Sequence, residues 1–82
     1  MAHDRIMIDP AVMLGKPCIA GTRITVEHIL RQLAGGMPAT EIVRGHPRLK
    51  PDDIAAAQAY AADVLAMPSV RSQLAAENAS AG

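Results

Sequence analysis

The clearest hydrophobic pattern of the chain lies in its middle, where apolar residues recur at helical spacing after Thr25. The apolar positions i, i+3, i+4, i+7 and i+8 are Val26, Ile29, Leu30, Leu33 and Ala34. This spacing places them on one face of a helix. Thr25 suits the N-cap position, and Glu27 suits the positive first turn. Gly35 and Gly36 are typical of a helix end, so the pattern predicts a helix over residues 26–34.

A second, shorter helix is predicted over residues 38–45. Pro38 suits an early helical position, because the N–H that proline lacks has no helical partner there. Ile42 and Val43 supply its buried side, and Pro47 follows the end of the segment. The connection from the first helix is only three residues long, Gly35–Met37, which is as short as the turn of a helix-turn-helix unit.

A third and longer helix is predicted from about Pro51 to Ala66. Pro51 fits the first helical position, and Asp52 and Asp53 oppose the positive end of the helix dipole. Its apolar face consists of Ile54, Ala57, Ala61, Val64 and Leu65. Many of its other positions are alanine, which favours a helix and lets a neighbouring helix approach closely.

Two short apolar runs precede these helices and indicate β-strands. Residues 5–9 are stopped by Pro10, and residues 18–20 are followed by Gly21. Neither run is long enough to be stable alone. We expect the two strands to pair, and to pack on the helices or against a second copy of the chain.

The C-terminal segment, residues 68–82, carries a much weaker pattern. Val70 and Leu74 allow one or two amphipathic turns, but such a segment does not fold by itself. We expect a free tail, and the alternative is a segment that orders on a partner. The predicted organisation is therefore one domain over residues 1–67 followed by a tail over residues 68–82.

The composition limits how stable this domain can be on its own. The chain has 82 residues and a mass of 8.6 kDa, and a chain of that size buries only about 60% of its unfolded surface. Half of the residues are apolar, yet there is no Phe or Trp, Tyr60 is the single aromatic residue, and 16 residues are alanine. A core of such small side chains is thin, and oligomerisation is the usual remedy.

Several classes of protein are disfavoured by the same composition. No run approaches the roughly 18 apolar residues that span a bilayer, and no signal peptide is expected at the start of the chain. Cys18 is the single cysteine, so no internal disulfide can form and a cytoplasmic, reducing location is expected. A single aromatic residue argues against RNA recognition by base stacking.

Enzyme chemistry has little support in the sequence. Cys18 lies in an apolar run and is expected to be a small core residue. The three histidines are far apart in sequence and have no zinc-ligand spacing; they are His3, His28 and His46. The segment Gly15–Pro17 lacks the other glycines and the Lys-Ser/Thr ending of a phosphate loop. We expect no catalytic residue, metal or cofactor.

The charge is unevenly distributed although the net charge is zero. Residues 1–24 carry +1, residues 25–50 carry +2, and residues 51–82 carry −3. Three basic side chains precede the third helix, Arg44, Arg48 and Lys50, where they could reach DNA phosphates. Asp52 and Asp53 weaken this interpretation, because carboxylates at the start of a recognition helix repel phosphates. The alternative is a small helical bundle with a solvated basic surface.

The segment Gly21–Thr25 also has two interpretations. Gly21 is expected to adopt a backbone conformation that other residues avoid, and Thr22 to bond the turn backbone. Our preferred prediction is that Arg23 pairs with Asp9 or with a helix C-terminus. The alternative is that Arg23 binds a phosphate or a partner's carboxylate, which places it with the DNA-binding candidates.

A combination of short motifs resembles a small bacterial family, the domain-of-unknown-function family 433. The first group is Ile8-Asp9-Pro10, Gly15-Lys16-Pro17, Gly21-Thr22-Arg23-Ile24 and Val26. The second group is Ile42, His46-Pro47, Leu49, Asp53-Ile54, Ala57 and Tyr60-Ala61. Together they extend from residue 6 to about residue 62. The combination is specific, whereas no single motif would be.

The resemblance implies a mainly α fold: a three-helix, homeodomain-like or winged helix-turn-helix domain with a short N-terminal β element, commonly homodimeric. Members are often encoded beside a PIN-like ribonuclease and are regarded as antitoxins of type II toxin–antitoxin pairs. By that resemblance the chain would bind and silence such a toxin, and as a dimer it would bind operator DNA and repress its own operon.

The expected mechanism under this resemblance is masking of the ribonuclease by the C-terminal tail. The acidic tail would order over a groove that is basic where it holds RNA. A PIN-like active site also holds carboxylates for divalent metal, so Arg71 is the candidate to occupy that centre. Val70 and Leu74 would supply apolar anchors.

The alternative function is a stand-alone DNA-binding transcriptional regulator with no toxin. Its candidate DNA-binding residues are Arg23, Arg44, Arg48 and Lys50. The chain departs from the family at two helix starts, with Pro38 where Ser or Thr is usual and Lys50 where Thr is usual. Each change removes a capping oxygen, at a cost of about 1 kcal/mol.

Overall fold

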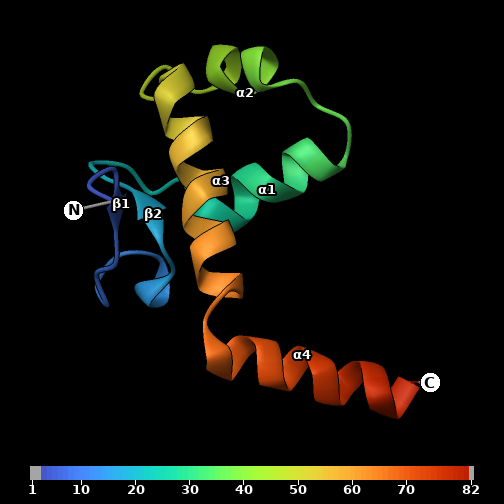
Figure 1. Cartoon of the computed structure of the whole chain (residues 1–82). Helices are drawn as coiled ribbons and strands as arrows, with labels where there is room; N and C mark the ends of the chain where they lie inside the picture. Colours follow the sequence, from blue (N-terminus) through green and yellow to red (C-terminus); the bar gives the residue numbers. More distant parts are fainter. Residues whose placement is uncertain (1–2, 82) are drawn as a thin grey trace.

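The computed structural model describes residues 3–81, which form four α-helices and a small β element. The elements are β1 (Ile6–Met7), the 3₁₀ turn η1 (Met13–Gly15), β2 (Cys18–Ile19), α1 (Val26–Ala34), α2 (Ala39–Gly45), α3 (Pro51–Leu65) and α4 (Pro68–Ala81). Figure 1 shows α3 running through the centre, with the β element on one side and α4 leaving from its far end. The mainly helical class with a short N-terminal β element is the one the sequence predicted.

The two strands pair with each other, as predicted. They are antiparallel, with Ile6 opposite Ile19 and Met7 opposite Cys18. The short ladder is extended by a further bridge between Cys18 and Thr25. Two-residue strands are therefore held by the chain that follows them as well as by each other.

The hydrophobic core lies where α1, α2 and α3 meet the β element. Its buried residues are Ile19, Val26, Ile29, Ile42, Leu49, Ile54 and Ala57. Most of the predicted apolar face of α1 is confirmed, since Val26 and Ile29 are buried and Leu30 and Leu33 are half-buried against the core. Ala34 was expected on that face but is exposed at the end of the helix.

The N-termini of α1 and α3 are capped in different ways. Thr25 caps α1 as predicted, because its Oγ1 accepts a hydrogen bond of 3.0 Å from the His28 N–H. Lys50 precedes α3 and supplies no side-chain cap. Instead Asp53 Oδ2 accepts from the Lys50 N–H at 2.9 Å, and the Asp53 N–H donates to the Lys50 carbonyl at 2.9 Å. The Asp53 carboxylate thus caps the N-terminus of α3, where no threonine is present to do so.

The C-terminal half of α3 is less buried than its apolar pattern predicts. Leu65 is 53% exposed, and Ala61 and Val64 are half-buried. These side chains line an open apolar groove of about 480 Å³ between α3 and α1, together with Leu30 and Tyr60. The predicted apolar face exists, but within the described residues no element covers its last turns.

The expectation of a free C-terminal tail, and with it the count of three helices, is wrong. Residues 68–81 form the helix α4, and Gly82 lies outside the described residues. Pro68 stands at its N-terminus, where proline is tolerated, and its four alanines favour the helical state. Most of the described side chains of α4 face solvent, so its amphipathic pattern is weak. For this reason the sequence did not predict the helix.

Candidate functional site

Two of the six arginines stand apart from the others in the described structure. Four are bound within the chain, through the contacts Arg5–Asp53, Arg31–Glu27, Arg44–Glu41 and Arg48 with the Gly21 carbonyl. Within residues 3–81, the side chains of Arg23 and Arg71 have no hydrogen-bond or ion-pair partner. An arginine that a folded chain leaves unpaired is free to bind something else. Each of these two marks a candidate surface.

Arg23 lies in a turn whose backbone is held by several hydrogen bonds. Gly21 has a φ of +79°, the left-handed conformation that the sequence predicted for it. Thr22 Oγ1 donates to the Ile19 carbonyl at 2.8 Å and accepts from the Ile24 N–H at 3.0 Å, which confirms its predicted role. From the other side Arg48 Nη1 donates to the Gly21 carbonyl at 2.9 Å. We call residues 19–24 the Gly21 turn.

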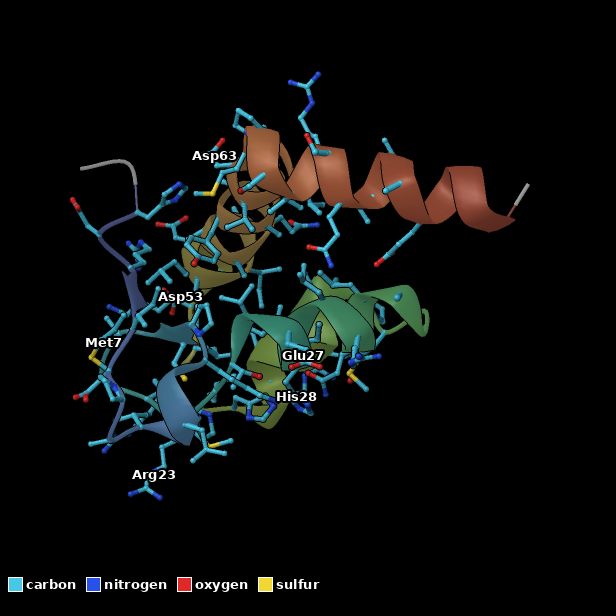
Figure 2. All side chains as sticks on the ribbon, turned by 90° about the horizontal axis from the view of Figure 1, so that it is seen from below. Met7, Arg23, Glu27, His28, Asp53 and Asp63 are labelled. Atoms are coloured by element: carbon cyan, nitrogen blue, oxygen red, sulfur yellow. The ribbon has the colours of Figure 1, made fainter. Side chains whose placement is uncertain are left out.

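The predicted pairing of Arg23 with Asp9 is wrong. Asp9 Oδ1 accepts instead from the Ala11 N–H at 2.9 Å, because a short-range Asx turn satisfies this carboxylate. Figure 2 shows the Arg23 side chain at the end of the Gly21 turn, pointing away from the helices. The interpretation that remains is the alternative one, in which Arg23 meets a ligand or a partner.

The Gly21 turn borders an open hollow of about 520 Å³, which we call the Arg23 hollow. Its charged or ionisable side chains are Arg23, His46 and Arg48. Apolar side chains supply the rest of its side-chain lining, Met7, Val12, Ile24 and Pro47, with Thr22. No acidic residue is among its lining residues. The hollow thus combines positive charge with an apolar surface.

The predicted DNA-binding residues are only partly brought together. Arg23 and Arg48 share the Arg23 hollow. Arg44 lies on α2, where its Nη1 pairs with Glu41 at 3.2 Å, and Lys50 stands at the N-cap of α3. Neither Arg44 nor Lys50 lines the hollow. Sequence proximity grouped Arg44 with Arg48, whereas the fold groups Arg48 with Arg23.

The N-terminus of α3 is occupied by an ion pair that the sequence did not indicate. Asp53 is buried, and its Oδ1 lies 3.0 Å from Arg5 Nη1. Arg5 Nη2 also lies 3.5 Å from Asp52 Oδ2, which is well exposed. Arg5 therefore positions the β element against α3. Its only signal in the sequence was a basic residue beside a strand, because its partners are 47 and 48 positions away.

The second candidate surface is one face of α4. Val70, Arg71 and Leu74 occupy positions i, i+1 and i+4, so they lie on the same side of the helix. Leu74 is 43% exposed, and Met67, one turn before Arg71, is 51% exposed. The sequence singled out the first three residues but missed Met67, which directly follows the end predicted for the preceding helix at Ala66.

The histidines and the cysteine do not form a metal site in the described residues. His28 and His46 are brought into an edge-to-face contact with ring centroids 5.9 Å apart. His3 contacts Tyr60 and places Nε2 2.7 Å from Asp63 Oδ2. Within residues 3–81 no three His, Cys, Asp or Glu side chains gather as metal ligands would. Cys18 is buried, as predicted for a core residue.

The carboxyl group of Glu27 has a lowered pKa. Hydrogen bonds from Lys16 and Arg31 lower the pKa of its carboxyl below the ordinary value of 4.5. The Lys16 Nζ and Arg31 Nε atoms both lie 3.1 Å from Glu27 oxygens. Glu27 and Arg31 are among the residues that line the groove between α1 and α3, so this ion-pair network supplies the charged part of an otherwise mainly apolar lining.

Comparison with known proteins places most of the chain in one family. Residues 6–61 match the model of a family described as "Protein of unknown function (DUF433)". The chain has no match among the curated proteins or the solved structures that were compared with it. The matched segment contains the Arg23 hollow and stops before α4. In the part of the chain that the structure describes, no helix has the length and apolar character needed to cross a membrane.

Proposed function

The chain belongs to the DUF433 family, whose function is unknown, and from that premise we propose that it is an antitoxin-like protein of a type II toxin–antitoxin pair. It neutralises a PIN-like ribonuclease by direct binding through α4. The observation that carries the proposal is the exposed α4 itself. This helix of 14 residues leaves the end of α3 (Figure 1), with Leu74 43% exposed and Val70 half-buried.

A helix of this kind is suited to a groove on another protein. Recognition of a helix in a groove uses anchors one turn apart, and Val70 and Leu74 have that spacing. A 14-residue helix is marginal in water when it has few contacts, so a partner that covers its face stabilises it. Because the helix is already formed, binding costs less conformational entropy than ordering a free tail would.

Arg71 supplies the electrostatic part of the proposed inhibition. It lies beside the two anchors, and its side chain has no hydrogen-bond or ion-pair partner within residues 3–81. The carboxylates that hold divalent metal in a PIN-like active site attract a guanidinium group, which forms bidentate hydrogen bonds with them. Occupation of that centre by Arg71 excludes both metal and RNA, so inhibition is stoichiometric and involves no chemistry by this chain.

The proposal is tested with purified chain and its candidate ribonuclease in an RNA-cleavage assay. Leu74→Asp removes an anchor and Arg71→Glu reverses the charge, and both are expected to abolish inhibition at equimolar ratio. Ser72→Asp is the matched control, because Ser72 lies on the opposite side of the helix from Leu74. Full inhibition by both Leu74→Asp and Arg71→Glu would remove the basis of the proposal.

The proposal includes a finer description of the first three helices. We assign α1–α3 with the β element as a homeodomain-like or winged helix-turn-helix domain, acting as a cytoplasmic homodimer. The short connection 35–38 between α1 and α2 supports the helix-turn-helix assignment. The apolar groove between α1 and α3 supports dimerisation, because exposed apolar patches on small domains mark interaction sites.

A second candidate function is DNA binding, by an antitoxin that represses its own operon or by a stand-alone regulator. One observation favours it: Arg48 and Lys50 both lie in the connection before α3, where a helix-turn-helix protein contacts phosphates. Arg48→Ala and Lys50→Ala are each expected to reduce the salt dependence of promoter binding by about one counterion. Fluorescence anisotropy with the promoter and with scrambled DNA separates specific from non-specific binding.

A further inference from the structure

The Gly21 turn presents a charged side chain on a rigid backbone. The Ile19 N–H donates to the Ile24 carbonyl at 2.9 Å, closing the turn that Thr22 bridges from within. Arg48 holds the turn from outside through the Gly21 carbonyl. Arg23 itself takes no part in any of these bonds. Because the backbone is already ordered, a ligand that binds Arg23 does not have to order the turn.

The charge around this position points to an anion. Arg23, His46 and Arg48 line the hollow, and no acidic side chain lines it with them. Arg48 uses one N–H for the Gly21 carbonyl, and a guanidinium group has five donors, so further donors remain. A phosphate monoester has several oxygens and a double charge, so two guanidinium groups can bind it at once. A single carboxylate needs only one arginine.

The rest of the lining indicates what the phosphate is attached to. Met7, Val12 and Ile24 give the hollow an apolar surface, which inorganic phosphate would leave uncovered. Its volume of about 520 Å³ is in the range of sites for small molecules. We propose that the Arg23 hollow binds a nucleotide, with the phosphate between Arg23 and Arg48 and the base or sugar against the apolar side chains.

This site is separate from the surface assigned to the ribonuclease. No residue of α4 lines the hollow, and Arg71 and Leu74 belong to no element that touches it. The two proposals therefore fail independently. Loss of nucleotide binding leaves the α4 hypothesis intact, and the reverse also holds.

The test uses the full-length chain and three soluble probes. Adenosine 5′-monophosphate is titrated into ¹⁵N-labelled protein, followed by adenosine and by inorganic phosphate. We expect the monophosphate to shift the amide signals of residues 21–24 and 46–48 in a saturable way. Adenosine lacks the charge and inorganic phosphate lacks the apolar part, so both bind more weakly. Equal effects of all three probes, or shifts outside these residues only, would overturn the proposal.

Arg23→Ala and Arg44→Ala form a matched pair of variants. Each removes one positive charge from an exposed arginine, but only Arg23 lines the hollow. We expect Arg23→Ala to weaken binding of the monophosphate by about tenfold, the effect of losing charge-assisted hydrogen bonds, and Arg44→Ala to leave it unchanged. Far-ultraviolet circular dichroism checks that both variants fold. Equal affinities of the two variants would show non-specific attraction and contradict the site.

A nucleotide can be free or part of a nucleic acid strand, and a fourth probe distinguishes these sources. A short single-stranded oligonucleotide is titrated under the same conditions. Tighter binding of the oligonucleotide that remains sensitive to Arg23→Ala assigns the site to the end or backbone of a strand. Equal or weaker binding assigns it to a free nucleotide. Absence of binding by either probe at millimolar concentration would refute the site.

Discussion

Arg23 and Arg71 have in common that no group in the described chain forms a hydrogen bond or ion pair with their side chains, but the two regions that carry them are built in opposite ways. The Gly21 turn is stabilised by hydrogen bonds from Thr22, Ile24 and Arg48. The helix α4 is attached to the rest of the described structure mainly through α3. A rigid turn beside a hollow is suited to a small ligand, whereas an exposed helix is suited to a groove on another protein.

The family match separates the same two regions. Residues 6–61 include the Gly21 turn and everything that fixes it, and α4 lies beyond them. The turn therefore belongs to what this chain has in common with its family. The helix α4 lies outside the matched residues, so its proposed role in partner binding does not follow from the family match.

The largest effect on stability is expected at Asp53, which fixes the β element to α3. Asp53→Ala removes the acceptor of the Lys50 N–H and the partner of Arg5 from a buried position. We expect a loss of about 2 kcal/mol in the free energy of unfolding, measured with urea. Asp52→Ala is the control, because that side chain is 80% exposed and its contact with Arg5 contributes little, about 0.5 kcal/mol. Equal losses would show that Asp53 does not fix the β element to α3.

The next effect is expected within the turn itself. Thr22→Val keeps the shape of the side chain but removes one donor and one acceptor of hydrogen bonds. The expected loss is about 1.5 kcal/mol in the free energy of unfolding. Thr40→Val is the matched control, since Thr40 is exposed on α2. If the two variants unfold at the same denaturant concentration, the turn is not held as described.

Removal of α4 is expected to have a smaller effect on stability and a complete effect on partner binding. A chain that ends at Met67 retains every buried core residue, so the free energy of unfolding should change by less than about 1 kcal/mol. The same truncation should abolish inhibition of the ribonuclease. Urea unfolding followed by circular dichroism measures the first quantity. A loss of more than about 2 kcal/mol would place α4 in the cooperative core.

The smallest effect concerns pH and the Glu27 network. Lys16 and Arg31 lower the pKa of the Glu27 carboxyl in the folded chain, so folding favours the ionised carboxylate. This stabilisation is complete above the unfolded value of 4.5 and is lost as the pH falls through the lowered pKa of the folded state. Thermal unfolding of the wild-type chain should therefore become more similar to that of Glu27→Gln as the pH falls from 6 to 3. A constant difference over this range would contradict the assignment.

Periodicity in the sequence was sufficient to locate the first three helices and the main core. Val26 and Ile29 on α1, and Ile54 and Ala57 on α3, are each spaced at i and i+3, and the face that each of these helices buries follows directly from that spacing. The turn residues were predictable for a similar reason. Gly21 and Thr22 have strong local preferences, and local preferences can be recognised without knowing the fold.

The features that could not be predicted depend on contacts between distant residues or on very weak patterns. Arg5 and Asp53 are 48 positions apart, and nothing local in the sequence pairs them. The partner expected for Arg23 was Asp9, but a nearer backbone N–H satisfies that carboxylate. The helix α4 has little amphipathic contrast, so its helical signals were only its alanine content and the spacing of Val70 and Leu74.

The most direct test of the central hypothesis, that α4 is the surface that binds the toxin, is affinity purification of the tagged full-length chain from its own host. The wild-type chain is compared with Leu74→Asp and Ser72→Asp, and the proteins that co-purify are identified by mass spectrometry. We predict that a small PIN-like ribonuclease co-purifies with the wild type and Ser72→Asp but not with Leu74→Asp. Recovery of that ribonuclease with all three chains, or with none, would contradict the proposal.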